Sequence, residues 1–227
     1  MSGPAWIPLF LTLKVAGWAT AFALVLGVGA GFVLARVRFW GRETLDAILT
    51  LPMVLPPTVL GYYLLVLVGR RGPIGRWLDA NFGVTLIFTW QGAVIAATIV
   101  AFPLVFKAAR AAFEGVDEKL EKAARSLGYG EFKVFVRVTI PLAWPGILAG
   151  TMLAFARAMG EFGATLMVAG SLPGKTQTLS IAIYEAVAAG DDRTGNYLVL
   201  VSSLLCIAVL VASSRVLRTG YMRMRAD

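Results

Sequence analysis

Residues 121–141 read EKAARSLGYGEFKVFVRVTIP and form a charged segment inside an otherwise apolar chain. Hydrophobic residues make up 58% of the 227 residues and charged residues only 15%, whereas a soluble domain carries about a quarter charged residues. Several runs on both sides of the segment approach the roughly 20 apolar residues that cross a bilayer as a helix. The sequence therefore predicts an all-α fold, a polytopic membrane helix bundle.

The net charge of +8 does not indicate a nucleic-acid partner, because the basic residues are scattered between apolar runs and form no stripe. Cys206 is the single cysteine, and histidine is absent. These counts exclude a disulfide framework, a Cys/His zinc site and catalysis by histidine. Lys14 interrupts the first apolar run and no small-residue cleavage pattern follows, so we expect this helix to be retained rather than removed as a signal peptide.

The apolar runs predict five membrane spans. They cover residues 6–35, 44–68, 84–106, 140–170 and 197–216, with polar connections at 69–83 and 171–196. The fourth run is longer than one untilted crossing needs, so a division of this run into two spans, giving six, is the alternative. In the first run, Gly27 and Gly31 have the spacing of a small-residue face that allows close packing of two helices.

Prolines interrupt the second span at Pro52, Pro56 and Pro57. Pro56 and Pro57 cannot supply the amide hydrogens of a regular helix, and Pro57 disfavours helical geometry at Pro56. We therefore expect a kink or a short unwound turn. Such a break either packs against other helices or lines a wet pathway, and the sequence leaves both possibilities open.

The basic residues are distributed unequally between the two sides of the predicted bundle. With five spans, 14 of the 21 Lys and Arg residues fall on one side, in the loop after the first span, between Lys107 and Arg137, and in the tail from Arg215 to Arg225. Basic residues favour the cytoplasmic side of a membrane. The count predicts an N-terminus outside and a cytoplasmic C-terminus.

The charged segment has the pattern of a short amphipathic helix. Ala123, Ala124 and Leu127 are apolar neighbours on such a helix, and Gly128 and Gly130 are typical of its end. The charges come from Glu118, Glu121, Lys122 and Arg125. From this pattern alone, the helix either docks into a partner or lies in the lipid headgroups.

The same segment resembles the EAA loop of importer-type ABC transporter permeases, whose pattern is E-A-A, three residues, G, nine residues, I-x-L-P. Ala123-Ala124, Gly128 and Val138-x-Ile140-Pro141 carry the resemblance, while Lys122 stands where Glu is usual and Glu121 precedes it. The resemblance implies that the segment, about 114–137, couples the chain to an ATPase subunit. The residues implied in coupling are Glu118, Glu121, Lys122, Ala123, Ala124, Arg125, Leu127 and Gly128.

Two further stretches resemble the narrower family of molybdate (molybdate/tungstate) permeases. These are LPMVLPPTVLGYYLL at 51–65 and GEFGATLMVAGSLPGKTQTLSIAIY at 160–184, and sulfate permeases share the GEFG element. The resemblance implies one permease domain over 1–227 in the inner or plasma membrane. It also implies a homodimer, two ATP-binding cassette subunits that hold ATP and Mg, and an external oxyanion-binding protein. No catalytic site or cofactor of its own is expected in this chain.

Two alternatives remain at this point. One is a permease for a sulfate-type oxyanion, because of the shared element. The other is a channel or membrane scaffold that is not coupled to ATP, in which the charged segment only holds a cytoplasmic partner.

Arg157 and Glu161 are four residues apart within the fourth apolar run. Ionisable groups at such depth are costly and usually face the bundle interior as a pair. The pair either fixes helix packing or adds positive potential to an anion pathway. The candidate residues for the translocation path or its gate are Arg157, Glu161, Phe162, Gly163, Thr165, Pro56 and Pro57.

Overall fold

The computed structural model describes residues 6–223, with side chains described for 6–212, and every regular element in this range is helical. The all-α prediction is confirmed. The elements are α1 (Trp6–Arg36), α2 (Arg42–Val54), α3 (Pro57–Val68), α4 (Pro73–Phe82), α5 (Trp90–Glu114), α6 (Glu118–Ser126), α7 (Glu131–Val134), the π-helix η1 (Phe135–Thr139), α8 (Ile140–Met159), α9 (Gly163–Ala169), α10 (Leu179–Ala188) and α11 (Asp192–Arg223).

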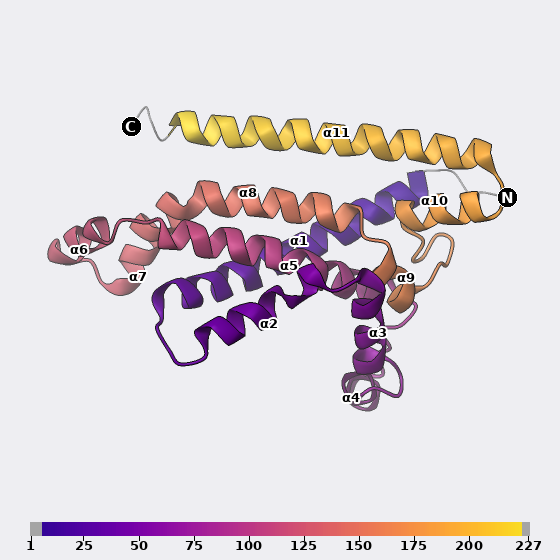
Figure 1. Ribbon diagram of the computed structural model, residues 1–227, viewed down its shortest axis with the longest axis horizontal. Coiled ribbons are helices and arrows are strands. Elements are labelled where there is room, and N and C mark those ends of the chain that lie inside the picture. The colour runs from indigo at the N-terminus through magenta and orange to yellow at the C-terminus, as the bar shows by residue number, and fades with distance from the viewer. Residues whose placement is uncertain (1–5, 224–227) are drawn as a thin grey trace.

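Helix α5 is the centre of the bundle and packs between α1 and α8 (Figure 1). Small residues allow the backbones to approach closely on both sides. A Cβ added at Gly31 of α1 would lie 2.9 Å from the Arg110 amide nitrogen of α5, and one added at Gly150 of α8 would lie 2.3 Å from the Ala108 Cβ. The predicted packing face on the first helix is confirmed, since Gly27 meets Val105 in the same way.

Four helices are long and apolar enough to cross a membrane: α1, α5, the continuous run from α7 through α8, and α11 as far as Ala212. The pair α2 and α3 is bent by 112° at its break and makes a fifth span if the two helices are counted together. The predicted break at Pro56 is confirmed, and it is much sharper than a kink. Pro57 is the first residue of α3. The amide hydrogen of this position has no partner within a helix, so a proline here loses no hydrogen bond.

The structure corrects three boundaries. Helix α8 ends at Met159, and the rest of the fourth run forms α9, whose seven residues reach only about 10 Å and cannot cross a bilayer. The connection at 171–196 contains α10, which buries Leu179 and Ile181 and is therefore not merely polar. The connection at 69–83 contains α4.

The two ends of the bundle carry different elements (Figure 1). Helix α1 begins beside α10 at one end, whereas α6 and α7 lie at the other end, toward which α11 runs. The assignment of these ends to the outside and the cytoplasm stays a prediction. Of the tail arginines used in that assignment, Arg225 lies outside the described residues, and the side chains of Arg215, Arg218 and Arg223 are not described.

Candidate functional site

The charged segment folds as the predicted short helix, α6. Asp117 caps its start, where the carboxylate accepts the Lys119 amide hydrogen at 2.9 Å. Glu118 and Glu121 lie in the first turn and Arg125 in the last, which suits the helix dipole. Gly128 follows with φ of +86°, a left-handed conformation that glycine adopts without strain. The helix therefore ends where the sequence predicts.

Glu121 faces inward and joins three elements. Its Oε1 accepts hydrogen bonds from Arg36 Nη2 at the end of α1, at 2.6 Å, and from Thr139 Oγ1 of η1, at 2.7 Å. Arg125 Nη2 lies 3.8 Å from Oε2. Only 5% of Glu121 is exposed. A charge-assisted pair in such a place is strong and directional, so α6 is tied to α1 and α8.

The position of Glu121 accounts for the departure at Lys122. One residue on a helix turns the side chain by about 100°, so the carboxylate of residue 121 faces the bundle while Lys122 faces outward. Lys122 Nζ lies 3.2 Å from Glu118 Oε2, and both side chains are exposed. Lys122, at the position where Glu is usual, therefore points outward, and the acid at residue 121 points into the bundle.

Most of the predicted coupling residues form an exposed surface at this end. Glu118, Lys122, Ala123, Arg125, Leu127 and Gly128 are exposed, whereas Glu121 and Ala124 are buried. Leu127 is 78% exposed, although it is apolar. Arg125 Nε donates to Glu131 Oε1 at 2.7 Å, and this hydrogen bond raises the pKa of Arg125. The surface combines charges with one prominent leucine.

A second charged cluster fastens α2 to α5 near the same end. The Asp46 carboxylate accepts from Lys107 Nζ and from Arg110 Nη1, each at 2.5 Å. Glu114 accepts from Arg110 Nε at 2.9 Å and from Arg42 Nη2 at 2.7 Å. No described residue of α2 is buried. The ion pairs are therefore an important attachment of this helix to the bundle.

The two broken helices meet at their breaks. A Cβ added at Gly163, the first residue of α9, would lie 3.0 Å from Pro57 Cβ at the start of α3. One turn further along α3, a Cβ at Gly61 would lie 2.7 Å from Met167 Cβ. The absence of side chains at both glycines lets α3 and α9 lie in close contact. The structure thus brings two of the predicted gate residues, Pro57 and Gly163, together.

An ion pair joins the last turn of α8 to the break that follows it, and only its carboxylate is buried. Arg157 Nη1 lies 2.7 Å from Glu161 Oε2, and the side-chain exposures are 37% and 2%. The other carboxylate oxygen accepts the Ala164 amide hydrogen of α9 at 2.9 Å. Glu161 thereby links the end of α8 to the start of α9. The predicted pairing is confirmed, and its position at a break gives it a structural role.

The remaining gate candidates lie in different surroundings. The Phe162 ring packs against Tyr184 of α10, with ring centroids 5.0 Å apart. Thr165 is 1% exposed, so its side chain lies within the protein. Pro56 is exposed. The predicted gate residues therefore differ in exposure, from the buried Thr165 to the exposed Pro56.

Sequence patterns gave no signal for the long-range ion pairs. Arg36 and Glu121 are 85 positions apart, and Lys107 and Asp46 are 61 apart. Excess charge near the predicted span ends was the single available hint. Within the described part of the chain, no group of three or more His, Cys, Asp or Glu side chains could hold a metal ion.

Comparison with known proteins is consistent across sequence and structure. Residues 6–222 match the family described as "Binding-protein-dependent transport system inner membrane component". The molybdenum transport system permease protein ModB of Escherichia coli (strain K12) is 45% identical over 93% of both chains. A probable sulfate transport system permease protein, cysT, of Chlorella vulgaris is 34% identical over 88% of this chain and 75% of its own length.

Solved structures have the same fold at low sequence identity. The inward-facing MetNI methionine ABC transporter gives a TM-score of 0.73 at 19% identity, over 97% of this chain and 99% of that chain. A bacterial ABC transporter involved in the import of alginate gives 0.76 at 14% identity, over 96% of this chain and 80% of that chain. At these identities the likeness concerns the fold.

Proposed function

Because this chain belongs to the family of binding-protein-dependent transport system inner membrane components, we propose that it is the transmembrane permease subunit of an ABC importer for molybdate. The observation that supports molybdate as the substrate is the 45% identity to a molybdenum permease over 93% of both chains. The sulfate relative is less similar, at 34%. The chain is a multi-pass membrane protein and a transport subunit.

Membership of this family of transport components also leads us to propose the partners of the chain. Two copies of the chain form the pathway, two ATP-binding cassette subunits bind ATP and Mg, and an external binding protein delivers the oxyanion. Hydrolysis of ATP belongs to the partner subunits, and this chain supplies no catalytic group or cofactor. The exposed surface of α6 supports docking to the ATPase, since it presents Leu127 between charged residues at one end of the bundle.

Coupling runs through the inward side of α6. When the ATPase subunits close, they move α6, and the hydrogen bonds of Glu121 to Arg36 and Thr139 carry that movement to α1 and α8. Helix α8 ends at Met159, with Arg157 in its last turn, and the break at 160–162 contains Glu161 and leads to Gly163 at the start of α9. Helix α8 is continuous from Ile140 to Met159, so displacement of its start is passed to its end.

The gate lies at the contact between Pro57 and Gly163. The Arg157 guanidinium in the last turn of α8 is partly exposed, and Glu161 neutralises its charge. One compensated cation gives a weak anion site, and weak sites suit release of an ion that a separate protein has captured tightly.

The decisive experiment is ATPase stimulation and uptake in vesicles that contain the chain and its ATPase subunits. The binding protein is supplied loaded with molybdate, tungstate or sulfate. We expect stimulation by the molybdate-loaded protein and at least tenfold less by the sulfate-loaded protein. Preference for sulfate would overturn the substrate assignment, and oxyanion flux without ATP would overturn the importer.

A further inference from the structure

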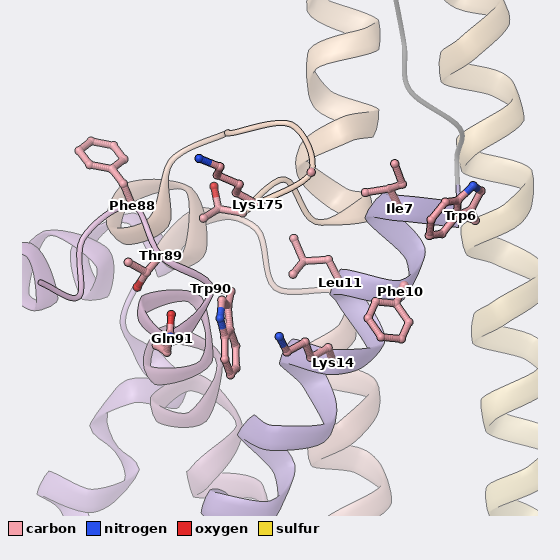
Figure 2. A pocket seen from close by; sticks show the side chains of 12 residues that line it. Trp6, Ile7, Phe10, Leu11, Lys14, Phe88, Thr89, Trp90, Gln91 and Lys175 are labelled. Carbon is pink, nitrogen blue, oxygen red and sulfur yellow. The ribbon is translucent and has the colours of Figure 1, made fainter. Parts of the chain in front are cut away.

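A hollow of about 620 Å³ lies between the first turns of α1, the start of α5 and the loop before α10. The start of α1, which lines it, lies at the end of the bundle opposite α6 (Figure 1). Figure 2 shows Lys14 reaching from α1 toward the indole of Trp90, while Lys175 is carried by the loop. The walls are mainly aromatic and aliphatic, with Trp6 and Phe10 at one side. The hollow is thus an apolar space with two ammonium groups at its edges.

Neither lysine has a carboxylate within 4.0 Å among the residues whose side chains are described. Lys14 Nζ instead lies 3.7 Å from the centroid of the Trp90 ring, a cation–π contact that leaves its charge uncompensated. Lys175 is exposed on its loop and can reach a ligand through its flexible side chain. The hollow therefore carries two positive charges and favours an anion.

The length of α1 places Lys14 near the headgroups. Its 31 residues extend about 46 Å at about 1.5 Å per residue, against a hydrocarbon core of about 30 Å. A centred helix extends beyond the core by roughly 8 Å at each end. Lys14 lies about 12 Å along the helix from Trp6, which puts its Cα some 4 Å inside the core boundary. A lysine side chain spans that depth and places its ammonium at the headgroup level.

After Lys14 in the sequence, α1 has a continuous stripe of apolar side chains on its exposed surface. Trp18, Phe22 and Leu26 follow at intervals of four residues and are 51%, 49% and 57% exposed. The rings of Trp18 and Phe22 have centroids 6.0 Å apart. Such a stripe matches an extended hydrocarbon chain that continues from an anionic group at Lys14.

We propose that this hollow binds an anionic phospholipid, with the lipid phosphate between Lys14 and Lys175 and an acyl chain along Trp18, Phe22 and Leu26. A small free oxyanion would need several converging hydrogen-bond donors to hold it tightly. Of the other polar side chains that line the hollow, the Thr89 and Thr176 hydroxyls already donate to the Leu86 and Gly170 carbonyls. Two lysines beside aromatic and aliphatic side chains suit a ligand with one anionic group and a long apolar part.

The test compares lipid retention by native mass spectrometry. The chain, purified with its ATPase subunits, is equilibrated with mixed micelles of equal phosphatidylglycerol and phosphatidylcholine. We expect preferential retention of phosphatidylglycerol, reduced about fivefold by Lys14→Gln and about fivefold by Lys175→Gln. Lys14→Arg should retain the lipid, because it keeps the charge. Arg71→Gln removes one exposed charge from the turn before α4, outside the hollow, and should change nothing.

Lys175→Gln keeps the test valid if Lys14→Gln impairs folding, since Lys175 is exposed on a loop. Unchanged retention in a correctly assembled Lys14→Gln, Lys175→Gln double variant would overturn the proposal. So would displacement of the lipid by millimolar sodium phosphate or sodium molybdate that itself binds through the two lysines, which would make the hollow a free-oxyanion site. Loss of the dimer in the double variant would instead identify the surface as covered by a second copy.

Discussion

Arg36 Nη2 and Glu121 Oε1 lie 2.6 Å apart, joining the last residue of α1 to the middle of α6. Their side chains are 22% and 7% exposed, so water screens the pair only in part. Thr139 adds a hydrogen bond to the same carboxylate oxygen at 2.7 Å. Helix α6, which presents the docking surface, is thereby attached both to the end of α1 and to η1, directly before α8.

Glu121→Gln should uncouple transport from ATP hydrolysis. The amide keeps a partner for Thr139 but leaves the Arg36 guanidinium without its counter-charge, a loss of about 2 kcal/mol for a partly buried pair. We expect the ATPase complex to assemble and its stimulation by loaded binding protein to fall at least fivefold. Glu43→Gln changes an exposed acid of α2 that is not among the coupling residues, and it is the control. Equal effects of the two changes would argue against transmission through Glu121.

Gly128→Asp should weaken docking of the ATPase without unfolding the spans. The φ of +86° at Gly128 strains any other residue by about 1 to 2 kcal/mol, and the added charge lies at the end of α6. Gly130→Asp adds the same charge at an ordinary φ of −69° and serves as control. Co-purification of the ATPase measures docking. An intact Gly128→Asp complex with normal uptake would contradict the docking role.

Arg157→Ala should destabilise or inactivate the permease more than Arg76→Ala. Removal of Arg157 leaves the Glu161 carboxylate, 2% exposed, with only the Ala164 amide, at a cost of about 2 to 3 kcal/mol. Arg76 is exposed in α4. Thermal unfolding in detergent and uptake both report the difference. Addition of Glu161→Gln should restore part of the stability, because it removes the uncompensated charge.

Gly31→Ala should lower the melting temperature, whereas Gly29→Ala should not. The new Cβ at residue 31 would meet α5 backbone at 2.9 Å, but at residue 29 nothing lies within 4 Å. Overpacking of this kind costs about 1 to 3 kcal/mol, while alanine at an open helical position gains up to about 1 kcal/mol. A reversed order would show that another surface covers Gly29.

Asp46→Asn should loosen α2. This residue holds Lys107 and Arg110, and α2 buries none of its own residues. We expect amide hydrogen exchange over residues 42–54 to accelerate about tenfold, since local opening requires less free energy. Asp79→Asn in the exposed part of α4 is the control. Unchanged exchange would show that apolar contacts hold α2 without the ion pairs.

Features that depend on neighbouring residues could be predicted from the sequence. The span pattern, the break before Pro57 and the end of α6 at Gly128 follow from local hydropathy, a missing amide hydrogen and the conformational freedom of glycine. Helix α10 was missed because its ten residues follow a polar, Gly- and Pro-containing loop. The end of α8 was missed because the apolar composition continues through Gly160.

Contacts between distant residues could not be predicted in this way. Nothing in the spacing of Arg36 and Glu121 distinguishes this pair from the many other pairs of opposite charges in the same segments. The meeting of Pro57 with Gly163 likewise depends on how two broken helices lie in space. Even so, both residues were candidates, Pro57 because it interrupts a helix and Gly163 because it lies close to Arg157 and Glu161 in the sequence.

The π-helix between α7 and α8 makes the number of residues in this joint significant. Its wider turn over Phe135–Thr139 accommodates an extra residue that an α-helix would not contain. If the same residues were wound as a regular α-helix, α7 would be rotated relative to α8 by about 100°. Thr139 would then turn away from Glu121, even though every charge and every apolar side chain involved were still present. The contact between Thr139 and Glu121 therefore depends on the hydrogen-bond pattern of this joint as well as on its side chains.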